Sequence, residues 1–128
     1  MAEGTDNVLA FRKQEPAFRV LPAEGQPLTE WADEDLMQEQ GRGNDAAFDE
    51  LIRRHEKSVL NYIFRMVHNR HIAEELTQEV FMALVKNGQR YAPTAKFTTY
   101  LYAIASNIVR KEWSRQKRRS RLFQFKWW

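Results

Sequence analysis

The sequence predicts an all-α fold, a compact bundle of about four helices behind a flexible N-terminal arm. Apolar residues recur three and four positions apart through most of residues 33–119, which is the period of a helix with one buried face. No segment alternates apolar and polar residues as a half-buried strand would, and no internal repeat is visible. A chain of 128 residues suits one domain with a single modest core.

The first 32 residues are predicted to form the arm, because they hold three of the four prolines and show no sustained hydrophobic period. We expect order to begin near Asp33, with a helical domain over residues 33–119. Residues 120–128 are then a basic-aromatic tail or the start of a linker. Asp33 can cap a short helix over residues 34–40, which Gly41 and Gly43 would end.

Two longer helices are predicted next. The first runs from about residue 44 to residue 68 and can be capped by Asn44 or Asp45. Its apolar stripe consists of Phe48, Leu51, Ile52, Val59, Tyr62, Ile63, Met66 and Val67. A break at residues 68–70 separates it from a helix over about residues 71–86, which Asn87 and Gly88 would end. The stripe of that helix is Ile72, Ala73, Leu76, Val80, Phe81 and Leu84.

The last helix is predicted from about Ala95 to Arg119, after a loop over residues 88–96 that contains Pro93. Thr94 can cap it. Its inner stripe is Phe97, Leu101, Ile104, Ala105 and Ile108.

Composition excludes several classes of protein. The chain has no cysteine, so it has neither disulfides nor thiolate zinc sites, as suits a cytoplasmic protein. No apolar run approaches the roughly 18 residues of a membrane span, and the N-terminus lacks the features of a signal peptide. His68 and His71 straddle a helix break without an obvious third ligand, so no metal and no cofactor are expected. No nucleophile-and-base pairing or phosphate-binding glycine loop is present, so the chain is not predicted to be an enzyme.

Charge is distributed unevenly along the chain. Residues 108–128 carry eight Lys or Arg side chains and a single acid, Glu112, although the whole chain carries only +3. An acidic body with a basic end fits one face for a protein partner and another for phosphates. The alternative is an ordinary solvated basic tail.

The helix over residues 71–86 places four polar side chains opposite its apolar stripe, namely Glu74, Glu75, Gln78 and Glu79. Like charges at this spacing repel one another, so the face makes better sense opposite a basic partner. An ordinary solvated face is the alternative.

The last helix interleaves aromatic and basic residues, which suits unpaired nucleic acid, because bases stack on aromatic rings while cations hold the backbone. These residues are Tyr100, Tyr102, Trp113, Arg110, Lys111 and Arg115. The amide of Asn107 can donate to or accept from a base edge or phosphate. Alternatively, Tyr100 packs in the core and Asn107 makes an intramolecular bond.

The order of these motifs resembles the second conserved region of bacterial sigma factors, in particular the extracytoplasmic-function type. The run Glu74-Glu75-Leu76-Thr77-Gln78-Glu79 is followed by Phe97-x-x-Tyr100-Leu101-Tyr102-x-Ile104-Ala105-x-Asn107 and then by the basic run 115–119. The family commonly has Asp where Glu75 stands and Trp where Tyr100 stands. The resemblance implies two partners, the clamp helices of the RNA polymerase β′ subunit and the non-template strand of the −10 promoter element. An anti-sigma factor is a further partner that it allows.

The resemblance also implies which residues serve each partner. Those for polymerase are Glu74, Glu75, Gln78 and Glu79. Those for DNA are Gln89, Arg90, Tyr91, Thr94, Lys96, Tyr100, Asn107, Arg110, Lys111, Trp113, Arg115, Lys117, Arg118 and Arg119. The loop over residues 88–96 resembles a pocket for a flipped −10 base, so strand opening is the implied mechanism.

A complete sigma factor of this type continues into a second domain that reads the −35 element, whereas this chain stops at Trp128. The aromatic end could begin a linker in a polymerase channel, fold back onto the bundle or touch a membrane surface. The competing function is a sigma-like module that binds polymerase or a regulator without melting DNA.

Overall fold

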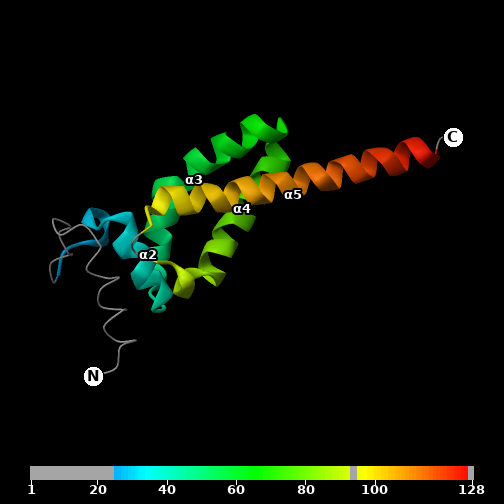
Figure 1. Ribbon diagram of the computed structural model, residues 1–128. Coiled ribbons are helices and arrows are strands. Elements are labelled where there is room, and N and C mark those ends of the chain that lie inside the picture. Colours follow the sequence, from blue (N-terminus) through cyan, green and yellow to red (C-terminus); the bar gives the residue numbers. More distant parts are fainter. Residues whose placement is uncertain (1–24, 93–94, 127–128) are drawn as a thin grey trace, which may run out of the picture.

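The computed structural model describes residues 25–92 and 95–126, and within them the fold is an all-α bundle without strands. Four helices form it: α2 (Asp33–Gly41), α3 (Asp45–Val67), α4 (Arg70–Lys86) and α5 (Phe97–Lys126). Two short 3₁₀ helices, η1 (Leu28–Glu30) and η2 (Gly88–Arg90), precede α2 and α5. Figure 1 shows α5 crossing the bundle and running out beyond it toward the C-terminus. The predicted fold class is therefore confirmed.

Helix α2 does not begin as predicted. Its N-cap is Ala32, which offers no side-chain cap, and Asp33 instead pairs with Arg54. Leu28 and Trp31 already pack against the core, so order begins before Asp33. The Trp31 indole N–H also donates to the Gln26 carbonyl at 3.0 Å. Residues 1–24 of the predicted arm lie outside the described residues.

Helix α3 is capped at both ends, and a short joint links it to α4. Asn44 caps the start of α3 by accepting from the amide of Ala46 at 3.1 Å, as predicted. At the far end His68 adopts a left-handed conformation with φ 55°, and its amide donates to the Phe64 carbonyl at 2.8 Å. Asn69 then caps α4 by accepting from the Ile72 amide at 3.0 Å.

The core is formed by apolar side chains from α2, α3, α4 and α5, with Tyr91 from the loop. Most of the predicted stripe residues are buried or partly buried. The exception is Met66, which is 36% exposed; Ile108 is partly buried as predicted, and Val109 is buried in addition to the predicted stripe of α5. Met66 lies in the last turn of α3, near the end of the bundle. The fully buried large side chains are Leu36, Met37, Leu51, Val59, Ile63, Val80, Leu84, Phe97 and Leu101.

The start of α5 is fixed by a residue that is distant in the sequence. The backbone N–H of Phe97 donates to the Glu34 carboxylate at 2.7 Å. A carboxylate suits this position, because the first amides of a helix have no partner within it. Thr94, the predicted cap, lies outside the described residues.

Helix α5 continues beyond the predicted end at Arg119 and reaches Lys126, so the predicted tail is helical over most of its length. Its residues after Arg115 are good helix formers, and nothing among them stops a helix. Glu112 is its last buried residue within 97–122, the part whose side chains are described. The outer part of α5 is therefore an exposed basic helix.

Candidate functional site

The acidic face of α4 lies on the surface. Glu74, Glu75, Gln78 and Glu79 are all exposed. Two of these acids have a basic neighbour one turn earlier: His71 Nε2 lies 2.9 Å from Glu75, and Arg70 Nε lies 3.8 Å from Glu74. Such exposed pairs contribute little to stability, so they leave the face available to a partner.

Gln78 also borders an apolar hollow that the sequence did not predict, which we call the α3–α4 groove. It has a volume of about 440 Å³. Met82 and Val85 on its rim are 63% and 44% exposed, so the hollow presents apolar surface to solvent. The only sequence signal for this groove was that both residues lie off the α4 stripe. The groove is lined by Phe48, Ile52, Glu56, Thr77, Gln78, Phe81, Met82, Val85 and Lys86.

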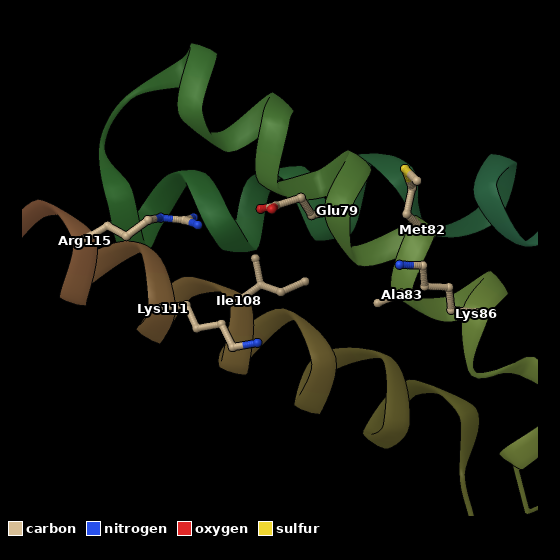
Figure 2. Close-up of a pocket in the computed structure, with 7 residues that line it drawn as sticks. All are labelled: Glu79, Met82, Ala83, Lys86, Ile108, Lys111 and Arg115. Carbon is tan, nitrogen blue, oxygen red and sulfur yellow. The ribbon is translucent and has the colours of Figure 1, made fainter.

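Glu79 faces a different neighbour. It lines a pocket between α4 and α5 with a volume of about 410 Å³, which we call the α4–α5 pocket. Figure 2 shows its carboxylate and the Arg115 guanidinium pointing toward one another across this pocket. The structure therefore separates Glu79 from the other predicted polymerase residues and brings it next to the basic helix.

Tyr91 and Tyr100 belong to the packed part of the molecule. Tyr91 is 7% exposed, and its hydroxyl donates to the Ala95 carbonyl at 2.5 Å. Its ring meets Tyr100 edge-on with centroids 5.2 Å apart. Burial raises the pKa of Tyr100, although the nearby charge of Arg90 opposes the shift. These contacts favour the alternative in which Tyr100 supports the core rather than a stacked base.

Asn107 and Trp113 remain at the surface of α5. Asn107 is exposed, and its side-chain oxygen accepts a hydrogen bond from Arg110. Trp113 is 45% exposed, while its indole N–H donates to the Met66 carbonyl at 3.2 Å. One end of the Trp113 ring is thus fixed against the last turn of α3. The bond that Asn107 makes joins two surface side chains and so leaves both within reach of a ligand.

A buried carboxylate organises the basic end of α5. Glu112 is 5% exposed and accepts hydrogen bonds from Arg115 at 2.9 Å and from Gln116 at 2.9 Å. Arg119 lies 3.7 Å from the same carboxylate. Arg115 is therefore held in place by Glu112, whereas Lys117, Arg118 and Arg119 are exposed.

A shallow hollow of about 320 Å³ on α5 collects several of the predicted cations, and we call it the α5 groove. It is lined by Arg110, Lys111, Ser114, Arg115 and Arg118. Arg90 and Lys96 are exposed near the start of α5. Thr94 and the side chain of Gln89 lie outside the described residues.

Other kinds of site are not found in this part of the chain. Within residues 25–92 and 95–126, no three His, Asp or Glu side chains are grouped so that they could hold a metal ion. None of the helices in these two segments is both long and apolar enough to cross a bilayer.

The structure thus places exposed acidic residues on α4 and exposed basic residues on α5, two helices that pack against each other. Residues 51–119 match the family described as Sigma-70 region 2. The chain belongs to this family. Its similarity to extracytoplasmic-function sigma factors identifies it as a region 2 domain of that type, and the family is one of transcription initiation factors rather than enzymes.

Two curated relatives illustrate the similarity. The RNA polymerase sigma factor CarQ of Myxococcus xanthus is 37% identical over 53% of this chain and 39% of its own length. The sigma factor SigE of Mycolicibacterium smegmatis, also of the extracytoplasmic-function type, is 38% identical over 52% of this chain and 26% of its own length. The chain thus spans less than half the length of these relatives.

A solved structure supports the same family. It is an engineered region 2 of sigmaE in complex with GTAAAA, determined by NMR. It superimposes with a TM-score of 0.65 at 27% identity, over 70% of this chain and 94% of the solved one.

Proposed function

We propose that this chain recognises the −10 promoter element and opens the strands there as region 2 of an alternative sigma factor bound to RNA polymerase core. The observation that carries the proposal is the pairing of two exposed faces of opposite charge on adjacent helices, α4 and α5. Complementary potentials would steer the α4 face to basic clamp helices of the β′ subunit and the α5 face to DNA. Such a factor acts in the cytoplasm, where polymerase is.

Single-stranded DNA is the form that best suits α5. The engineered sigmaE region 2 was solved with the short sequence GTAAAA, which is compatible with a related strand on this chain. Asn107 and the partly exposed Trp113 ring offer an amide and an aromatic surface beside the cations of the α5 groove. An intact duplex hides its base faces, so these groups would act on unpaired bases.

The loop over residues 88–96 is proposed to set which −10 base is preferred. Tyr91 is packed rather than open, so the specificity would come from the exposed loop side chains, such as Arg90 and Lys96. Grafting this loop from a relative with a different promoter should move the base preference. An unchanged preference would exclude the loop as the capture pocket.

Direct binding tests the DNA half of the proposal. A labelled single strand containing GTAAAA should bind more tightly than the matched duplex in fluorescence anisotropy. Asn107→Ala should weaken this binding by about 1–3 kcal/mol, because a base or phosphate loses its partner. Asn61→Ala, at an exposed asparagine on α3, is the matched control. If Asn107→Ala lowers thermal stability but not DNA affinity, its amide serves the fold alone.

Charge reversal tests the polymerase half. Glu75→Lys together with Glu79→Lys should weaken capture of the isolated β′ clamp fragment. Both positions are exposed, so helix content by circular dichroism should stay unchanged. Asp45→Lys together with Asp49→Lys, at two exposed acids on α3, controls for net charge. Capture equal to that of the parent would leave the acidic face as a solvated surface.

The α3–α4 groove favours a second candidate, a module that binds polymerase or a regulator such as an anti-sigma factor without melting DNA. Its exposed Met82 and Val85 are typical of a protein-binding surface. The two functions differ in the single-strand experiment. A pure interaction module would show no preference for GTAAAA over its duplex.

A further inference from the structure

The α4–α5 pocket carries more positive charge than a polymerase-binding α4 explains. Lys86 enters it from α4, and Lys111 and Arg115 enter it from α5 (Figure 2). Glu79 supplies the single carboxylate on its wall. Even with Arg115 paired to Glu112, three cations against two acids leave a net positive hollow, and such a hollow favours an anionic ligand. Its remaining walls are the apolar side chains of Met82, Ala83 and Ile108.

Two of the three cations of this pocket, Lys86 and Lys111, are not neutralised by the part of the fold that the structure describes. Within residues 25–92 and 95–126, neither Lys86 nor Lys111 forms a salt bridge, and both are exposed. Arg115 is shared with Glu112, which lies 2.9 Å away and fixes the direction of its guanidinium. Two free ammonium groups and one oriented guanidinium suit a phosphate, which accepts from several donors at once.

The pocket is continuous with the rest of the basic surface. Lys111 and Arg115 line both the α4–α5 pocket and the α5 groove. These two residues stand one helical turn apart, about 6 Å along the axis at 1.5 Å per residue. A strand lying in the α5 groove would therefore reach the pocket without leaving the cations. This continuity is the reason to assign the pocket to DNA rather than to an acidic protein segment.

We propose that the α4–α5 pocket is a subsite for a backbone phosphate of single-stranded DNA, with Lys86 as the contributor from α4. The inference rests on the proposed function, because it needs a DNA strand on α5. Glu79 would repel the bound phosphate, because its carboxylate lies on the wall of the same pocket. Lys86 is absent from the residues that the sequence predicted for DNA, because it belongs to the helix assigned to polymerase.

The test compares salt dependence in the full 128-residue chain. Lys86→Gln and Lys111→Gln should each lower the magnitude of the slope of log affinity against log salt by about 0.7, the value for one phosphate contact with a single strand. Lys57→Gln, at an exposed lysine on α3 that lines neither hollow, should leave the slope unchanged. Glu79→Gln should strengthen binding, because it removes the repulsive charge.

Two probes separate this inference from the function on which it rests. One single strand contains GTAAAA and the other is oligothymidine of equal length. A phosphate subsite predicts the same slope change on both, whereas −10 recognition predicts tighter binding of the first. Equal affinity for the two probes, together with a reduced slope in Lys86→Gln, would contradict −10 recognition and support the phosphate subsite. Tighter binding of GTAAAA with an unchanged slope in Lys86→Gln would support −10 recognition and contradict the phosphate subsite. If neither probe binds, both proposals are overturned.

A neutral phosphate analogue locates the contact. Methylphosphonate is placed at one position after another in the GTAAAA strand. At one position it should weaken binding by the parent but not by Lys86→Gln, because both changes remove the same interaction. If every position weakens the parent and Lys86→Gln equally, Lys86 does not contact the DNA backbone.

Discussion

At the scale of single residues, charge inside the bundle is stabilised by pairing. Glu50 is 8% exposed and accepts hydrogen bonds from Arg53 at 2.6 Å and from Arg54 at 2.7 Å. These bonds lower the pKa of Glu50 from 4.5 to about 2. Burial raises the pKa of Asp33, but the hydrogen bonds and charges of His55 and Arg54 outweigh it, and the net shift is downward. The network ties η1, α2 and α3 together, because Arg54 also donates to the Leu28 carbonyl at 3.0 Å.

Glu50 should make the fold sensitive to acid. Its pKa is lower in the folded chain than in the unfolded chain, so its stabilisation is complete above about pH 4.5 and is lost as the pH falls toward about 2. Glu50→Gln should remove this part of the pH dependence and cost about 1–3 kcal/mol at neutral pH, because Arg54 loses a partner. Urea unfolding followed by circular dichroism from pH 2 to pH 7 measures both effects. Asp49→Asn is the exposed control, and parallel curves for the parent and Glu50→Gln would contradict the prediction.

Gly88 is predicted to be required for lack of space rather than for its backbone conformation. A Cβ there would meet the end of the Gln40 side chain, well inside van der Waals contact. Gly88→Ala should cost on the order of 1 kcal/mol, because the opposing atom is the tip of a flexible side chain. Adding Gln40→Ala should make the glycine change nearly neutral in urea unfolding. Strictly additive losses in the double variant would show that the contact is unimportant.

At the scale of helices, α5 consists of two unlike parts. Phe97, Leu101, Ala105 and Val109 are buried in the core, and the Phe97 ring contacts His55 with centroids 5.2 Å apart. Beyond Glu112 the helix has no buried side chain as far as residue 122, the last one whose side chain is described. Packing therefore stabilises the inner part, while the outer part depends on its own helix propensity.

Hydrogen exchange should divide α5 at this point. Amides of residues 101–112 should exchange only through opening of the whole bundle, because their helix face is buried. Amides of residues 117–126 should exchange many times faster, since fraying opens them locally. Mass spectrometry or NMR can follow both segments in one sample. Equal protection along the whole helix would mean that something else packs against the outer part.

The sequence predicted the helices well and their ends less well. Hydrophobic periodicity located α3 and α4 because each buries one stripe, and Asn44 gave a local start signal. The start of α5 carries no such signal among the described residues, because Glu34 caps it from 63 residues away. Its end was placed too early, at Arg119, because the apolar stripe that marks a packed helix ends near Ile108, whereas residues 120–126 continue the helix on their own propensity.

The candidate site was predictable where it depends on one helix face. Glu74, Glu75 and Gln78 lie off the α4 stripe and are exposed as expected. Tyr91 was expected to meet DNA but is buried, because a loop residue's burial depends on what folds over it. The α3–α4 groove and the role inferred for Lys86 could not be predicted, since each hollow is assembled from two helices.

At the scale of the whole molecule, opposite charges are separated onto neighbouring surfaces. Acids cluster on the outer face of α4, and cations line the α5 groove and the outer part of α5. The α4–α5 pocket is where the two surfaces meet, because Glu79 faces Arg115 there (Figure 2). A partner on either surface therefore changes the electrostatic potential felt by the other.

Removing charge from the outer part of α5 should weaken DNA binding without changing its sequence preference. Replacing Lys117, Arg118 and Arg119 by Gln should lower the magnitude of the salt slope by about 1–2. This change in slope is smaller than three unpaired cations would give, because the Arg119 guanidinium lies 3.7 Å from the Glu112 carboxylate. Anisotropy titrations at several salt concentrations measure it. Lys57→Gln with Arg65→Gln is the control on α3, and an unchanged slope in the triple variant would remove this segment from the DNA contact.

The outer part of α5 is also a lever. Its last described residue, Lys126, stands about 21 Å along the axis from Glu112, at 1.5 Å per residue. A sideways force applied near that end is multiplied by this length into a torque at the last packed turn. The nearest fixed point is the bond from the Trp113 indole to the Met66 carbonyl, at the end of α3. A partner that binds the C-terminal end of α5 would therefore transmit force through this bond to the α3–α4 joint.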